Sequence, residues 1–167
     1  MRYKAIGYHG TSIDGKDTIF KKGIDLKRRS DDVFLGCGFY LWRDSYTRAK
    51  TWRKSEVVLE VELDVKQENI LNFTTSEQNN EKKILEIYFK YFESKKIYFG
   101  EFIDFLIDNE VNIHLVTILD LTNKHIIFPT QDPYKSTDKS VLAYGDIQIC
   151  IKNEKAIFGK IKETLCK

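Results

Sequence analysis

The chain has 167 residues, of which 42% are hydrophobic and 31% charged, and its formal net charge is +2. This size and composition predict one folded domain spanning residues 1–167 and argue against a disordered chain. No apolar stretch approaches the roughly 18 residues of a membrane-spanning helix, and the first four residues do not open a signal peptide, so we expect a cytoplasmic protein without membrane contact. Three cysteines without metal-ligand spacing favour free thiols, and we expect no metal site.

The apolar periodicity and the helix and strand breakers predict a mixture of strands and helices. In chain order, the first half is predicted to contain a strand over 3–9, a helix over 12–22, a strand over 36–42, a helix from 44 or 45, and strands over 57–65 and 70–73. The second half is predicted to contain helices over 76–93 and 100–109, a segment at 113–121 that fits a strand or a helix, strands over 125–128 and 144–152, and a final helix from 153 or 154. This mixture predicts an α+β domain with a helical insertion at about 76–110.

Two short motifs at strand ends predict a binding site. In Tyr8-His9-Gly10-Thr11 a histidine leaves an apolar run and meets a glycine, and in Gly36-Cys37-Gly38-Phe39-Tyr40-Leu41-Trp42 a glycine-rich turn opens onto an aromatic strand. Glycine lets a flat ligand approach the backbone, imidazole can hydrogen-bond a ribose hydroxyl, and an exposed tyrosine can stack on a heteroaromatic ring. Nucleotides carry both a ribose and such a ring.

This ordered pair of motifs resembles the ADP-ribosyltransferase superfamily, in the His-Tyr-Glu branch that includes diphtheria toxin and the poly(ADP-ribose) polymerases. The resemblance covers residues 3–54, is closest to small bacterial or phage members, and extends more weakly to a late strand around Gln148. It implies a split, mostly antiparallel β-sandwich around a cleft that binds NAD as a substrate.

The resemblance also implies roles for individual residues. His9 would bind the adenosine ribose of NAD, Gly10 would hold the nicotinamide amide through its backbone, and Tyr40 would stack on the nicotinamide ring. Thr11 and Gly38 are the remaining NAD-binding positions of the two motifs. His9, Tyr40 and Gln148 would be the catalytic residues.

The third position departs from the family pattern, in which a glutamate at the start of a late strand bonds the nicotinamide ribose. The candidate strand over 144–151 has no glutamate, so Gln148 is the best match and Asp146 the reserve. Its isoleucines alternate, which places Asp146, Gln148 and Cys150 together on the other face. A glutamine can bond a ribose hydroxyl but carries no charge to stabilise an oxocarbenium ion, which predicts a slower or differently tuned enzyme.

The basic residues are concentrated near the two motifs. All six arginines lie in the first 54 residues, where thirteen Lys and Arg against six Asp give +7, so the remainder of the chain is −5. Guanidinium groups bind phosphate oxygens in a bidentate fork, so this segment suits the diphosphate of NAD. For any single arginine, a solvated loop or helix surface is the simpler explanation.

We therefore expect a toxin-like, NAD-dependent mono-ADP-ribosyltransferase that modifies a macromolecular target, with a protein favoured over a nucleic acid, and releases nicotinamide. Three alternatives stay open. They are an RNA 2′-phosphotransferase on the same fold, a catalytically inactive module that binds NAD or ADP-ribose, and a protein-interaction domain.

Overall fold

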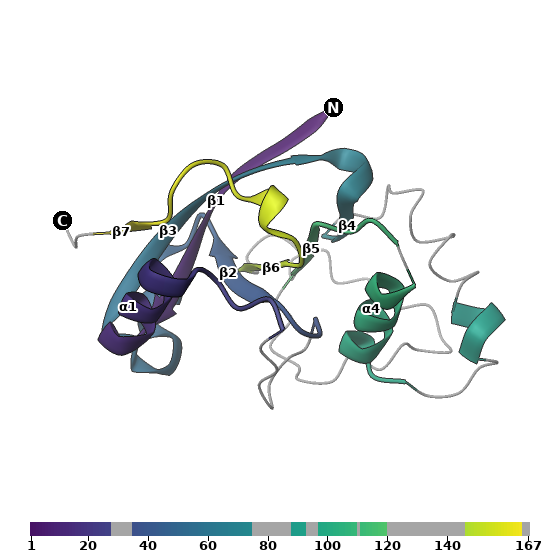
Figure 1. Cartoon of the computed structure of the whole chain (residues 1–167), viewed down its shortest axis with the longest axis horizontal. Helices are drawn as coiled ribbons and strands as arrows, with labels where there is room; N and C mark the ends of the chain where they lie inside the picture. The colour runs from purple at the N-terminus through teal and green to yellow at the C-terminus, as the bar shows by residue number, and fades with distance from the viewer. Residues whose placement is uncertain (28–34, 75–87, 93–96, 110, 120–145, 165–167) are drawn as a thin grey trace, which may run out of the picture.

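The computed structural model describes residues 1–27, 35–74, 88–92, 97–109, 111–119 and 146–164. Its strands are β1 (Arg2–Thr11), β2 (Phe39–Arg43), β3 (Val57–Lys66), β4 (Ile70–Phe73), β5 (Leu115–Leu119), β6 (Ile147–Ile151) and β7 (Lys162–Glu163). Its helices are α1 (Ile13–Lys22), α2 (Tyr46–Thr51) and α4 (Phe99–Asp108), with short 3-10 helices η1 (Trp52–Lys54), η2 (Gln67–Asn69) and η5 (Glu154–Ala156). The fold is therefore α+β, as expected (Figure 1).

The described strands form a single seven-stranded sheet in the order β4-β5-β6-β2-β1-β3-β7. All of their pairings are antiparallel except that of β4 with β5. The pairing between β1 and β2 is short, and we call this part of the sheet the joint. β1 pairs with β3 along its whole length, from Arg2 to Thr11, and β2 pairs with β6 from Phe39 to Trp42, whereas β1 and β2 pair only at Gly7↔Arg43 and Tyr8↔Trp42. After Tyr8, the remaining residues of β1 are paired with β3 alone, and the facing residues of β2 are paired with β6 alone.

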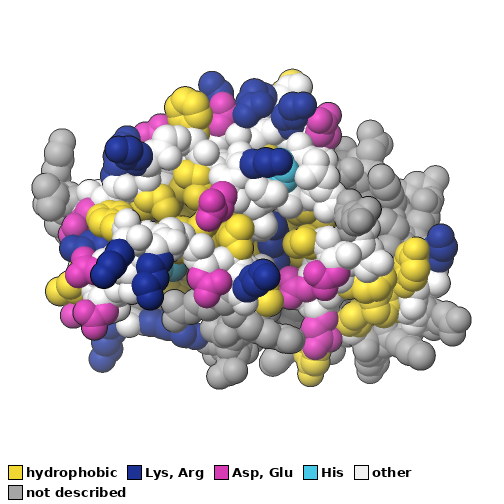
Figure 2. All heavy atoms as spheres, in the orientation of Figure 1, with side chains coloured by type: hydrophobic (Ala, Val, Ile, Leu, Met, Phe, Trp, Pro, Cys, Tyr) yellow, Lys and Arg dark blue, Asp and Glu magenta, His cyan; other side chains and the backbone are white. Residues whose placement is uncertain are grey.

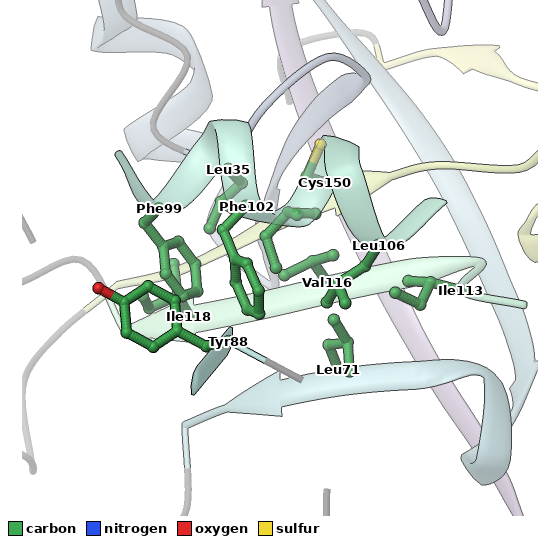
Figure 3. Close-up of a cluster of buried hydrophobic side chains, with 11 residues drawn as sticks. Leu35, Leu71, Tyr88, Phe99, Phe102, Leu106, Ile113, Val116, Ile118 and Cys150 are labelled. Atoms are coloured by element: carbon green, nitrogen blue, oxygen red, sulfur yellow. The ribbon is translucent and has the colours of Figure 1, made fainter. Parts of the chain in front are cut away.

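Helices cover both faces of this sheet. On one face, α4 packs on β4, β5 and β6 through the cluster in Figure 3, in which Phe102 and Leu106 meet Val116 and Cys150. On the same face, α2 contributes Ala49 to a smaller cluster; its members are Trp42, Ala49 and Val58, flanked by Tyr8 and Tyr46. The opposite face is covered by α1 and the C-terminal segment. In Figure 1, α1 lies to the left of β2 and α4 to the right of β6.

Local sequence signals account for the first half of the fold. Ser12 caps α1 by accepting the N–H of Gly15 at 3.0 Å, and Gly23 ends the helix at φ 84°, a conformation that favours glycine. The alternation from Leu59 onward places every second side chain of β3 in the core. The helix predicted over 12–22 and the strands predicted over 3–9, 57–65 and 70–73 are therefore confirmed.

The predicted C-terminal helix is wrong. After Asn153 the chain makes only η5 and then extends along β3, where the N–H of Phe158 bonds the Glu62 carbonyl at 2.8 Å and that of Thr164 bonds Val58 at 2.9 Å. The pairings of Ile157 and of β7 with β3 are both antiparallel, so the chain keeps one direction along β3, and Gly159, at φ 77°, lies between them. Pairing with the outer edge of β3 satisfies the backbone groups that a helix would have satisfied internally.

The helical middle of the chain is only partly described. Residues 88–92 and α4 are helical, and the ambiguous segment at 113–121 contains β5. The predicted strand over 125–128 lies outside the described residues. Within the described part of the chain, no helix is both long and apolar enough to cross a membrane.

Candidate functional site

The three strands that carry the predicted site residues are neighbours in the sheet, in the order β6-β2-β1. Tyr40 of β2 is paired with Cys150 of β6, and Trp42 is paired with Gln148. On the other side of β2, Trp42 is paired with Tyr8, the residue that precedes His9. Residues that lie more than 100 positions apart in sequence therefore converge on the joint between β1 and β2.

His9 contacts β2 directly at the point where the ladder ends. Continuing the register of β1 and β2 by two residues would place the Tyr40 carbonyl opposite Gly10. That carbonyl instead lies 2.8 Å from Nδ1 of His9. A carbonyl oxygen can only accept, so Nδ1 carries the hydrogen in this contact, and in the neutral imidazole Nε2 is an acceptor. Such an acceptor matches the hydroxyl of a ribose.

The side chains of His9 and Tyr40 lie on opposite faces of the sheet. Tyr40 shares the face of Trp42 and Cys150, which carries α2 and α4. His9 faces the other way, where its ring centroid lies 4.3 Å from that of Phe39. The two rings therefore do not face one ligand from the same surface, and the two strand ends meet through the contact between His9 and the Tyr40 carbonyl.

The hydroxyl of Tyr40 is bound within the fold. It accepts the N–H of Leu35 at 2.9 Å and donates to the carbonyl of Gly36 at 2.6 Å. Burial raises the pKa of this phenol, so it stays protonated and keeps both hydrogen bonds. The hydroxyl thus fixes the turn that precedes β2, and the ring is partly buried against the cluster beneath α4.

The glycines of the two motifs are required by close packing. A Cβ on Gly10 would overlap the carbonyl oxygen of Ala49 in α2, and one on Gly38 would lie 2.6 Å from the carbonyl oxygen of Ile151. A Cβ on Gly36 would overlap the carboxylate of Asp104 in α4. The space beside the Cα atoms at these positions is therefore filled by protein atoms, and a ligand would have to approach Gly10 along its backbone edge.

Gln148 lies on the same face as Tyr40, half-buried between paired residues of its two neighbouring strands, Trp42 and Ile118. The predicted alternation holds, since Ile149 and Ile151 are fully buried on the opposite face. Cys150 shares this face, as the alternation predicts, but it is completely buried beneath α4. Burial raises the pKa of the Cys150 thiol to about 11, so this cysteine is an unreactive core residue.

Asp146 is paired with a residue that the sequence did not single out, Arg48 of α2. Its Oδ2 lies 3.4 Å from Nε of Arg48, and the guanidinium lies 4.9 Å from the centroid of the Trp42 ring. This arrangement brings a cation next to Gln148 while neutralising the reserve carboxylate. The alternation of β2 places Trp42 in phase with Tyr40, but nothing local predicts its contact with Arg48.

Other arginines of the basic segment also have acidic partners. Arg2 pairs with Asp64, and Arg43 lies 3.6 Å from Asp44. Figure 2 shows basic and acidic side chains interspersed over one face of the molecule. Arg48 differs in its surroundings, because it contacts Asp146, two residues before Gln148, and the ring of Trp42, the residue paired with Gln148. Nowhere in those ranges do three or more His, Cys, Asp or Glu side chains gather in a way that could hold a metal ion.

No protein-family model, curated protein or solved structure matches this chain. We therefore infer function from the motifs and from the geometry of the joint between β1 and β2.

Proposed function

We propose that the protein is an NAD-dependent mono-ADP-ribosyltransferase whose site is the joint between β1 and β2. The observation that supports it most is the convergence of His9, Gly10, Tyr40 and Gln148 on three adjacent strands, at the place where the β1–β2 ladder ends. The motif resemblance suggests the substrate, and the convergence of the matched residues on the joint supports this location for the site.

NAD would lie across this joint. Because His9 and Gln148 face opposite sides of the sheet, the adenosine ribose would lie on the side of His9 and the nicotinamide ribose on the side of Gln148. The backbone edge of Gly10 would hold the amide of the nicotinamide ring, which is the end of NAD beyond the second ribose. The guanidinium of Arg48 would bind the diphosphate and would then lose its contact with Asp146.

In the reaction, the bond between ribose C1′ and the nicotinamide nitrogen breaks, and nicotinamide leaves as a neutral molecule with the bonding electrons. A nucleophile of the target then supplies the electron pair of the new bond to C1′ and loses its proton to solvent. The protein contributes positioning, which can supply much of the barrier reduction without a covalent intermediate. Gln148 would hold a ribose hydroxyl as charge develops on the ring.

A catalytically inactive NAD- or ADP-ribose-binding module is the second candidate. It is favoured by one specific observation: Gln148 is uncharged, and the nearby carboxylate of Asp146 is paired with Arg48. Such a module would bind NAD and release no nicotinamide.

Incubation of the full chain with labelled NAD and a cell lysate tests the proposal, with the labelled fraction identified by digestion. We expect label in macromolecules, sensitive to protease, and free nicotinamide in the supernatant. His9→Ala should raise the KM for NAD, while the matched variant His114→Ala, directly before β5, should not. Binding of NAD without nicotinamide release would favour the inactive module, and absence of binding would refute both.

A further inference from the structure

The turn at residues 35–38, here called the glycine turn, is held by side chains from three different elements. The hydroxyl of Tyr40 binds the N–H of Leu35 and the carbonyl of Gly36. The ammonium of Lys152, which directly follows β6, donates to the carbonyl of Leu35 at 2.6 Å and also to that of Cys37. A carboxylate of α4 binds one further backbone group, so side chains bind five backbone groups of the turn in all.

That carboxylate belongs to Asp104. Its two oxygens accept the N–H of Cys37 at 2.9 and 3.0 Å, and Oδ1 lies 3.2 Å from the ammonium of Lys152. Asp104 and Lys152 therefore bind each other as well as the turn. The glycine turn is therefore bound by a side chain of α4 and by one that follows β6, and these two side chains also bind each other.

Burial makes this arrangement resistant to displacement. The side chain of Lys152 is only 1% exposed, and that of Asp104 is 26% exposed. A buried ammonium requires several acceptors, and two of those available to Lys152 are carbonyls of the turn. If the turn moved away, the buried ammonium of Lys152 would keep only Asp104 as a partner. The turn and the ion pair therefore hold each other in place.

The glycine turn directly precedes the strand segment that contacts His9. Gly38 adjoins Phe39, and the Tyr40 carbonyl is the group that lies against Nδ1 of His9. Gly36 and Gly38 have φ values of 79° and 154°, so the backbone here is in a conformation that other residues rarely adopt. The position of the start of β2 therefore depends on the contacts that hold this turn.

We propose that Lys152 and Asp104 are positioning residues: they fix the glycine turn and thereby the β2 side of the site. The link to NAD rests on the proposed function. Neither side chain needs to touch the ligand. Misplacement of a positioned group by about 1 Å can lower the rate about 100-fold, so loss of the ion pair should weaken a site it does not contact.

The first experiment measures the turn without any nucleotide, using the half-buried thiol of Cys37 as the probe. All proteins carry Cys166→Ser, and Cys150 is fully buried, so alkylation by iodoacetamide, followed by mass spectrometry, reports on Cys37. We expect Lys152→Met and Asp104→Asn to raise the alkylation rate of Cys37 at least tenfold. The control Lys155→Met, which removes the same charge from an exposed position, should leave the rate unchanged.

Rates within twofold of the control in folded Lys152→Met would overturn the proposal. If that variant does not fold, Asp104→Asn decides alone, because its side chain is partly exposed and an asparagine can keep one bond to the turn. Unchanged Cys37 reactivity in Asp104→Asn would then refute the role of the pair.

The second experiment measures NAD binding by calorimetry with the same variants. If the parent binds NAD, we expect at least a tenfold loss of affinity in Lys152→Met and Asp104→Asn and none in Lys155→Met. Unchanged affinity in both would overturn the positioning role. If the parent does not bind NAD, the proposed function fails, while the alkylation rates still decide whether the pair fixes the turn.

Discussion

Replacing Tyr40 by phenylalanine removes a single oxygen atom that serves two backbone groups. The Leu35 N–H and the Gly36 carbonyl both lie in buried residues, and each loses its hydrogen-bond partner. Leaving a buried polar group without a partner costs about 1–3 kcal/mol. We therefore expect Tyr40→Phe to lower the free energy of unfolding by about 2–4 kcal/mol, allowing for partial relaxation of the turn.

Urea denaturation followed by tryptophan fluorescence measures this loss. The matched control is Tyr98→Phe, which removes the same atom from a side chain that is 66% exposed and should change the unfolding free energy by less than about 0.5 kcal/mol. If the two variants were equally stable, the hydroxyl of Tyr40 would not hold the glycine turn, and the account of that turn given above would be wrong.

Three further outcomes follow from the same geometry. Gly38→Ala should destabilise the protein more than Gly159→Ala in a thermal melt, because both sites have positive φ but only Gly38 has protein atoms in the path of the new Cβ; equal melting temperatures would contradict the packing. Burial raises the pKa of Cys150 to about 11, so the stability that depends on its neutral thiol is complete below pH 9 and is lost as the pH rises through 11. Over that interval the unfolding free energy of the wild type should fall by about 2–3 kcal/mol more than that of Cys150→Ala. Parallel pH profiles of the two proteins would refute this. Gln148→Glu should hydrolyse NAD as fast as the wild type or faster, since a carboxylate can stabilise the developing positive charge, provided it has a partner there; a slower variant that still binds NAD would argue against an ionic role at this position.

Much of the fold follows from local patterns in the sequence. The cap at Ser12, the glycine after α1 and the alternation of β3 each act within one element, so they could be identified without knowing what packs against it. The end of the chain shows the limit of this reasoning. Ile157 and Ile161 are four residues apart, a spacing that fits a helix, yet both pack in the core from an extended segment that pairs with β3. Long-range pairing prevailed over the local preference.

The candidate site was predictable as a set of residues and less so as a geometry. The motifs identified His9, Tyr40 and Gln148, but which face each occupies depends on the register between strands, which the motifs alone do not fix. Lys152 is in phase with Gln148 at the end of β6, a signal that could have been noticed. Its partner Asp104 lies on α4, 48 positions away, and only the packing of that helix brings the two together.

Nicotinamide release by the purified chain is the most direct measure of the proposed activity. With NAD as the only substrate, we expect release by the wild type and a loss of about 100-fold in Gln148→Ala, the order of effect seen when one preorganised hydrogen bond to a developing charge is removed. Binding of NAD should stay within a few-fold, and the matched variant Gln67→Ala, in η2 between β3 and β4, should behave as the wild type. A fully active Gln148→Ala protein would exclude this residue from catalysis, and a wild type that neither binds NAD nor releases nicotinamide would contradict the proposed activity itself.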